Sequence, residues 1–278
     1  MCGRCCRCGL GILPLVLAVL SVATFVITYV ISFLRNDTSW FPTISDTADH
    51  RPESNVFGLL FNFCSVVGLL TTFVRYLQLR HDADWNERDR VLLIRLNKVA
   101  LVFGIASSLG ASIVASFQED AVALVHIIGA FLVFVGGIFY CWVQTFISYK
   151  MKTCGLITNT LFGLRLLMAI AVSIFFISCV IATSYASNIS KDWIRYHVNS
   201  TTIAPRWDPK DKTYIHHVVG DVSEWLMALT LLGFMFTFFG EFRFVKMKIV
   251  VSRRSQHPVP LATGMGSSDD GLYNSLYV

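Results

Sequence analysis

The sequence predicts an all-α membrane protein, a bundle of six transmembrane helices with both termini in the cytoplasm. The first observation is six long apolar runs with few charges, since a helix needs roughly 20 apolar residues to cross a bilayer. The second is composition: 54% of the 278 residues are hydrophobic and 15% are charged, whereas soluble domains have about 25% charged residues. The third is the placement of basic residues, which orients the bundle.

The predicted spans cover residues 10–34, 56–79, 92–117, 121–147, 156–186 and 214–240. Inside lipid every backbone N–H and C=O needs a partner, and a helix supplies these partners within one segment. The spans and their connections form one membrane domain, residues 10–248. A cysteine-rich N-terminus, residues 1–9, precedes it. A polar tail with prolines, glycines and serines follows at 249–278, and its composition predicts a disordered cytoplasmic segment.

The first span is longer than the apolar region of a signal peptide, which has about 7–15 residues, so we expect it to be retained. Four cysteines precede it beside two arginines, namely Cys2, Cys5, Cys6 and Cys8. Thiols at a membrane surface are typical acceptors of S-palmitoylation. Unmodified cysteines and a metal site are the alternatives, but the spacing differs from that of structural zinc sites. We therefore expect no bound metal.

Basic residues near span ends mark the cytoplasmic side of a membrane. With a cytoplasmic N-terminus, fifteen of the 23 Lys and Arg residues lie on that side and seven on the other. Arg165, inside the fifth span, is expected to reach the cytoplasmic surface by extending its long side chain. Three N-glycosylation sequons, at Asn36, Asn188 and Asn199, fall in the two loops assigned to the lumenal or extracellular side, where glycosylation occurs. Asn199 is the best candidate, because the other two lie close to span ends.

Ionisable residues within spans are candidates for function, because burying them is costly. Glu119 lies in the turn between the third and fourth spans, and His126 follows about two turns into the fourth. In the sixth span His217, Asp221 and Glu224 share one helical face. These residues predict a polar network near the lumenal leaflet. It either links helices, binds a lipid headgroup or ion, or forms a hydrolase centre.

Two connecting segments carry further signals. The loop 36–52 has two prolines and an isoleucine among turn-forming residues, which predicts an ordered loop folded back on the bundle. Near the C-terminus, Tyr273 and Leu276 match a tyrosine-based sorting signal, which clathrin adaptors bind as an extended strand with two pockets. The basic residues flank spans and form no patch of their own, so no nucleic-acid partner is expected.

Several motifs occur in an order and spacing that resemble one family. They are FPTISDT at 41–47 with PES at 52–54, RLNK at 95–98, ASFQE at 115–119 with His126, and WDP at 207–209 with Tyr214, His217, Glu224 and Trp225. The combination is similar to the DNA-damage-regulated autophagy modulator (DRAM) family over roughly residues 10–248. Two positions differ from the family pattern. Ala48 stands where the family loop has glycine, and Asp221 stands where a small residue is expected.

The resemblance implies a six-span protein of lysosomal or late-endosomal membranes. Such a protein promotes autophagy without catalysis or cofactor, through membrane lipids or protein partners. Other relatives organise phosphoinositide kinases at the plasma membrane or act in lipid remodelling, so two alternatives stay open. One is a plasma-membrane organiser or sensor that recruits lipid kinases through an acylated N-terminus and a basic tail. The other is an intramembrane enzyme that uses His126, His217 and Glu224.

Overall fold

Six helices long and apolar enough to cross a membrane make up most of the described chain, as the composition predicts. The computed structural model describes residues 9–85, 87–189 and 213–246, and these ranges contain no strand. The long helices are α1 (Ile12–Arg35), α2 (Glu53–Asp82), α3 (Arg90–Ser116), α4 (Ala123–Thr153), α5 (Asn159–Ile189) and α7 (Tyr214–Phe236). The short helical segments are η1 (Gly9–Gly11), η2 (Asp46–Ala48), η3 (Ala83–Trp85) and α8 (Phe239–Phe242).

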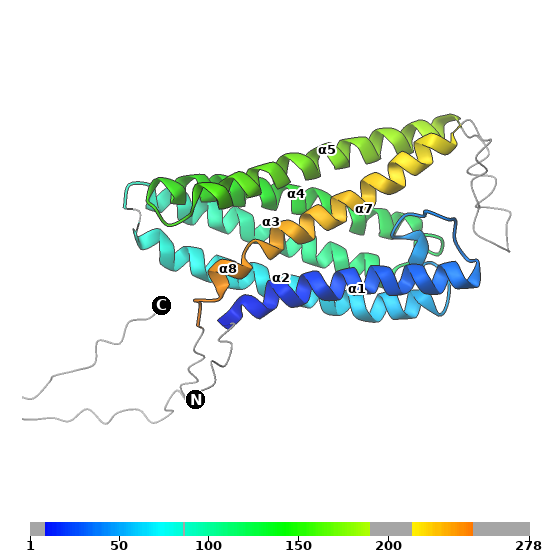
Figure 1. The fold of residues 1–278 in the computed structure, drawn as a ribbon, viewed down its shortest axis with the longest axis horizontal. Helices are drawn as coiled ribbons and strands as arrows, with labels where there is room; N and C mark the ends of the chain where they lie inside the picture. The colour runs from blue at the N-terminus through cyan, green and yellow to red at the C-terminus, as the bar shows by residue number, and fades with distance from the viewer. Residues whose placement is uncertain (1–8, 86, 190–212, 247–278) are drawn as a thin grey trace, which may run out of the picture. The chain divides into compact units, whose positions relative to one another are not determined.

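The long helices pack side by side in the order of the sequence (Figure 1). In addition α1 contacts α7, so the first and last spans close the bundle into a ring. One end of the bundle carries residues 36–52 and the turn between α3 and α4, and we call it the loop end. The opposite end carries Gly9 and Phe242, and we call it the terminal end.

The sixth predicted span is not one continuous helix. α7 ends at Phe236 and α8 begins at Phe239. At the break, the Thr237 N–H bonds to the carbonyls of Gly233 at 3.2 Å and Phe234 at 3.0 Å. The Thr237 hydroxyl also donates to the Phe234 carbonyl at 2.7 Å. These competing bonds tighten the last turn of α7 and let α8 follow as a separate turn.

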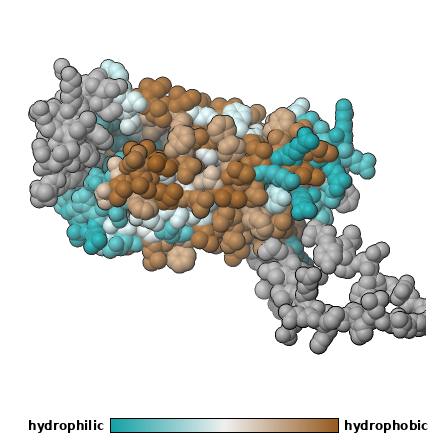
Figure 2. Space-filling model, turned by 180° about the vertical axis from the view of Figure 1, so that it is seen from behind, coloured by the Kyte–Doolittle hydropathy of each residue, from teal (hydrophilic) through white to brown (hydrophobic). Residues whose placement is uncertain are grey.

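The surface is apolar along the length of the bundle and polar toward its ends, as Figure 2 shows for one face. Large apolar side chains such as Val19 and Leu167 are more than 60% exposed, which suits contact with lipid tails. The interior instead contains small and hydroxyl-bearing residues. Thr24 and Thr28 of α1 are fully buried, and their hydroxyls donate to carbonyls one turn earlier. They are therefore satisfied without water.

The loop between α1 and α2 folds back on the bundle, which confirms the prediction for residues 36–52. The indole N–H of Trp225 donates to the Pro42 carbonyl at 2.9 Å, and the hydroxyls of Thr28 and Thr47 are 3.1 Å apart. An apolar cluster lies beneath the loop, formed by Phe25, Ile44, Ala48, Phe57 and Ala228. The loop is therefore a packed part of the membrane domain.

Candidate functional site

His126 joins three separate segments at the loop end. Its Nδ1 lies 2.7 Å from the Phe117 carbonyl, and its Nε2 lies 3.0 Å from the Ser45 hydroxyl. A carbonyl only accepts, so in the neutral ring Nδ1–H donates to Phe117 and Nε2 accepts from Ser45. α4 begins at Ala123, so His126 lies in its first turn rather than two turns into it. The ring holds the loop to the end of α3 and the start of α4.

Ser45 also connects His126 to Glu224. The Ser45 backbone N–H donates to the Glu224 carboxylate of α7. Glu119 Oε2 lies 3.9 Å from His126 Nε2, which is longer than a hydrogen bond. Thus Glu119, His126 and Glu224 gather at the loop end, but a serine missed by sequence reasoning separates His126 from Glu224. Ser45 belongs to the FPTISDT motif, and its place in that motif is the one feature of the sequence that points to it.

Asp221 and His217, the other two members of the predicted network, lie outside the contacts that His126 and Ser45 make. Asp221 is buried, with 8% exposure, and lies within electrostatic range of Asp46 and Glu119. His217 follows His216, whose ring lies 4.3 Å from the ring of Tyr185 on α5, centroid to centroid. The start of α7 therefore packs against α5.

Carboxylates crowd the loop itself. Asp49 Oδ1 accepts the backbone N–H of Glu119 at 2.9 Å, which ties the loop to the turn after α3. The pKa of Asp49 is raised to about 8. Burial is the main cause, and the neighbouring charges of Asp46, Asp120 and Glu119 add to it. Burial and the charges of Asp46 and Asp120 likewise raise the pKa of Glu119 to about 7. These groups keep their protons in mildly acidic surroundings.

The loop-end residues do not form a metal centre. Across residues 9–85, 87–189 and 213–246, no three His, Cys, Asp or Glu side chains are grouped so as to hold a metal ion. Both ring nitrogens of His126 are engaged by protein groups. The arrangement can hold the loop in place and present the Glu224 carboxylate.

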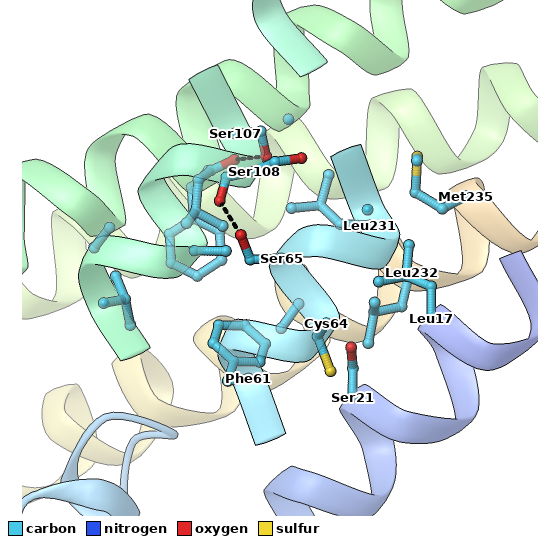
Figure 3. A pocket seen from close by; sticks show the side chains of 18 of the residues that line it. Leu17, Ser21, Phe61, Cys64, Ser65, Ser107, Ser108, Leu231, Leu232 and Met235 are labelled. Carbon is cyan, nitrogen blue, oxygen red and sulfur yellow. Dashed lines mark hydrogen bonds between the residues drawn. The ribbon is translucent and has the colours of Figure 1, made fainter. Parts of the chain in front are cut away.

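Glu224 also lines a cavity inside the bundle. The cavity has a volume of about 150 Å³ and lies among α1, α2, α3, α4 and α7. Figure 3 shows Ser21 of α1 and Cys64 of α2 directed toward each other across one wall, and Leu231, Leu232 and Met235 of α7 on another. No cavity was expected from the sequence, because its lining comes from five helices.

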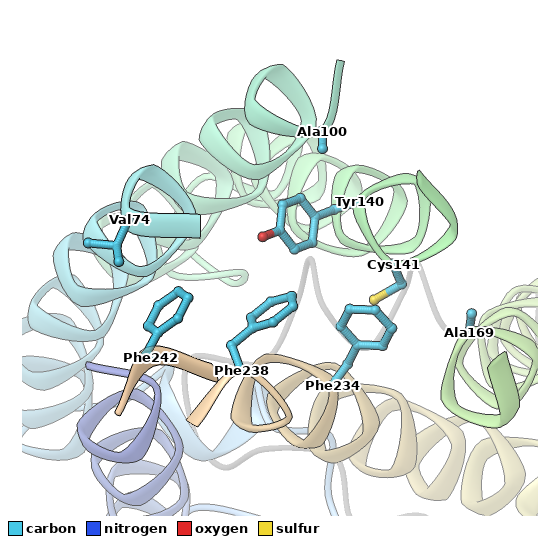
Figure 4. Packing of buried hydrophobic residues seen from close by; sticks show 8 residues of the cluster. All are labelled: Val74, Ala100, Tyr140, Cys141, Ala169, Phe234, Phe238 and Phe242. Atoms are coloured by element: carbon cyan, nitrogen blue, oxygen red, sulfur yellow. The ribbon is translucent and has the colours of Figure 1, made fainter. Parts of the chain in front are cut away.

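A second charged cluster lies at the terminal end. Arg75 of α2 and Arg165 of α5 are both completely buried. Glu241 of α8 pairs with both guanidinium groups, with its Oε1 2.8 Å from Arg75 Nη1 and its Oε2 against Arg165 Nη2. Both guanidinium carbons lie 4.7 Å from the centre of the Phe238 ring. Figure 4 shows Phe234, Phe238 and Phe242 along one side of the segment that contains α7 and α8, with Phe238 directed toward Tyr140 and Phe242 toward Val74.

The expectation that Arg165 extends to the membrane surface is wrong. Its Nε donates to the Thr237 hydroxyl at 3.0 Å and its Nη1 to the Ser148 hydroxyl at 2.9 Å. Burial is possible because Glu241 supplies the opposite charge. The signal was present in the sequence: two arginines and one glutamate border apolar runs, and an ionisable residue in a span needs a partner.

Several predicted features have no described structure. Cys2, Cys5, Cys6, Cys8, Asn199, Tyr273 and Leu276 lie outside the described residues. Asn188 lies in the last turn of α5, but its side chain is outside the described set. Asn36 is exposed and caps α1 in the left-handed conformation, with φ 62°. Palmitoylation, glycosylation and sorting therefore stay predictions.

Comparison with known proteins covers the whole bundle. Residues 9–245 match a family model described as the Frag1/DRAM/Sfk1/Cwh43P N-terminal domain. The chain is 35% identical over 244 residues to DNA damage-regulated autophagy modulator protein 2 of Rattus norvegicus, covering 87% of this chain and 86% of the relative. It is 35% identical over 243 residues to DNA damage-regulated autophagy modulator protein 1 of Mus musculus, covering 87% and 94% respectively.

A shorter match extends the comparison. Over 142 residues the chain is 34% identical to the modulator of macroautophagy TMEM150B of Danio rerio, covering 50% of this chain and 58% of the relative. No solved structure matches the chain.

Proposed function

Because this chain belongs to the Frag1/DRAM/Sfk1/Cwh43P family, we propose that it is a multi-pass membrane protein that modulates autophagy from the lysosomal or late-endosomal membrane. The observation that carries the proposal is the likeness to two autophagy modulators over nearly their full length. The match includes all six spans and the packed loop, so the proposal draws on whole relatives and not on one shared segment.

The geometry of the loop end supports a role without catalysis. His126 and Ser45 are engaged in holding the loop, and Asp49 fastens it to the turn after α3. We propose that the domain acts through membrane lipids or protein partners, with the loop end facing the lumen and the termini facing the cytoplasm. Clathrin adaptors that bind Tyr273 and Leu276 would then direct it to endosomes and lysosomes.

A tagged full-length copy imaged with a lysosomal marker tests the location. Autophagic flux is measured in the same cells after the gene is deleted and after it is restored. We expect the protein on lysosomes or late endosomes and a fall in flux on deletion. Exclusive residence at the cell surface, with unchanged flux, would favour the alternative of a plasma-membrane organiser that recruits lipid kinases.

A further inference from the structure

The cavity runs along the interior of the bundle from the loop end toward the terminal end. Ser45 and Glu224 line it at the loop end, and Tyr140, Cys141 and Met235 line it toward the other end. Between Glu224 and Met235, α7 rises by about 16 Å, roughly half of the hydrocarbon core. The cavity therefore lies at the depth occupied by lipid chains.

The walls of the cavity offer an apolar surface despite several serines. The Ser65 hydroxyl donates to the Ser108 carbonyl at 2.8 Å, and the Ser107 hydroxyl donates to the Val133 carbonyl at 2.9 Å (Figure 3). Their hydrogen atoms are thus taken up by helix backbones. The rest of the wall is largely aliphatic and aromatic, including Leu17, Phe61 and Leu231. Its further polar groups include the hydroxyls of Ser21, Thr72 and Tyr140. Apolar cavities of about 150 Å³ stay dry and accept apolar ligands.

The cavity is long enough for an extended hydrocarbon chain. Its lining follows α7 from Glu224 to Met235, a rise of about 16 Å. Small residues make this room, since Gly68, Ala111 and Gly137 come from three different helices around it.

Acidic residues lie at the end of the cavity that is nearest the loop end of the bundle. Glu224 is its one ionisable carboxylate, and Glu119, Asp46 and Asp221 lie within electrostatic range of it. A head group that donates hydrogen bonds, such as an ammonium or hydroxyl, is attracted here. A carboxylate head group has no hydrogen atom to donate to Glu224.

We propose that the cavity binds a single-chain amphiphile, with its hydrocarbon chain between α1, α2, α3 and α7 and its hydrogen-bond-donating head group at Glu224. The ligand class is a long-chain amine or alcohol, and not a fatty acid. The inference rests on the proposed function, because it gives the lipid partner named there a defined site.

Photo-crosslinking on the purified full-length protein in phosphatidylcholine nanodiscs tests the site directly. The probes are a long-chain amine, a long-chain alcohol and a fatty acid of equal chain length, each with a diazirine in the chain. We expect the amine and the alcohol to label cavity residues such as Ser21 and Cys64, and roughly tenfold less labelling by the fatty acid. Labelling confined to lipid-facing residues such as Phe63 and Val66, or equal labelling by all three probes, would overturn the proposal.

Three substitutions sharpen the test. A Cβ at Gly68 meets Ser108 Oγ at 3.4 Å and Leu17 Cδ1 at 3.8 Å, which are ordinary contacts, whereas a Cβ at Gly163 meets nothing within 4 Å. Gly68→Leu should fill the cavity and abolish internal labelling, and the matched exchange Gly163→Leu should not. Glu224→Gln should keep the chain bound but remove the preference for the amine over the fatty acid. Equal loss in both leucine variants would contradict the assignment.

The outcomes separate this proposal from the proposed function. Labelling of the unmodified protein needs no variant to fold and does not depend on autophagy. If the amine labels the cavity but deletion leaves autophagic flux unchanged, the binding site stands and the autophagy role fails. If flux falls on deletion but no probe labels the cavity, the autophagy role stands and the binding site fails.

Discussion

Glu241 lies between two guanidinium groups that have no contact with solvent, and it is the acid to which both are paired. Its own side chain is 16% exposed, so it bridges the buried arginines and the surface at the terminal end. Arg75 is also bonded to the amide oxygens of Gln144 and Gln78. Two charges of the same sign are thus held together by one carboxylate.

Glu241→Gln should destabilise the folded protein by about 3 kcal/mol, because removing one member of a buried charge cluster leaves the others uncompensated. Thermal unfolding of the purified protein in detergent measures the effect. Asp84→Asn is the matched control, because Asp84 and Arg90 form an exposed pair with 58% and 56% side-chain exposure, and such pairs contribute at most about 1 kcal/mol.

A triple exchange tests whether the charges stabilise or only compensate one another. Arg75→Met, Arg165→Met and Glu241→Met together should recover most of the stability lost in Glu241→Gln, because an apolar replacement of a whole buried charge cluster is often neutral or better. A triple variant less stable than the single one would show that the ion pairs themselves stabilise the bundle.

At the scale of elements, α3 and α4 pack closely where Gly110 meets the backbone of α4 at Gly129. A Cβ built on Gly110 would lie 2.6 Å from the Gly129 carbonyl oxygen and 2.7 Å from the Val133 backbone N. These are backbone atoms, so no side-chain rotation can relieve the contact. Small residues at such crossings let membrane helices pack backbone to backbone.

Gly110→Ala should therefore push α3 and α4 apart and cost about 1–3 kcal/mol, the range for overpacking. Gly163→Ala on α5 should be neutral or slightly stabilising, because its Cβ would meet nothing within 4 Å and alanine favours helix. Melting temperatures of the two variants in the same detergent measure the difference. Equal melting temperatures would mean that the crossing adjusts without loss.

The loop 36–52 should respond to pH through Asp49. Its carboxyl keeps a proton up to about pH 8 in the folded protein, against an ordinary pKa of 3.8. Between these values the folded state binds more protons than the unfolded state, so the loop's stability is greatest in acid and falls as pH rises toward 8. The negative charges of Asp46, Glu119 and Asp120 lie near Asp49 and also raise its pKa.

Hydrogen exchange of the loop amides measures this dependence. After correction for intrinsic rates, protection should be higher near pH 5 than near pH 8. Asp49→Asn should flatten the difference, since the amide oxygen still accepts the Glu119 N–H but carries no titrating proton. Asp84→Asn, in an exposed position outside the loop, should leave it unchanged. An unaltered pH dependence in Asp49→Asn would contradict the assignment.

At the scale of the whole molecule, the distribution of basic residues predicts that the termini face the cytoplasm. The same orientation places Asn199 in the lumen. Treatment of the cell-expressed protein with an N-glycosidase should increase its mobility, and Asn199→Gln should remove most of that shift. Epitope tags at both ends should be accessible once the plasma membrane alone is permeabilised. A tag that becomes accessible only when internal membranes are also permeabilised would reverse the predicted topology.

Parts of the candidate site were predictable and parts were not. Glu119, His126 and Glu224 were identified because ionisable residues in apolar spans are unusual, and all three lie at the loop end. Ser45 was not singled out, because a serine in a polar loop carries no such signal. Arg165 was expected to extend to the membrane surface, because long basic side chains near span ends usually do so, and Glu241 was not singled out.

The sequence by itself determined that the chain has six helices and where they lie, because run length and backbone hydrogen bonding in lipid allow little else. It also determined the family through ordered motifs. Only the tertiary structure decided which polar groups meet. Arg75, Arg165 and Glu241 are far apart in the chain and belong to three helices, and the cavity is lined by five. Such contacts depend on how the helices pack, and packing is set by side-chain shape across the bundle rather than by apolar periodicity along the chain.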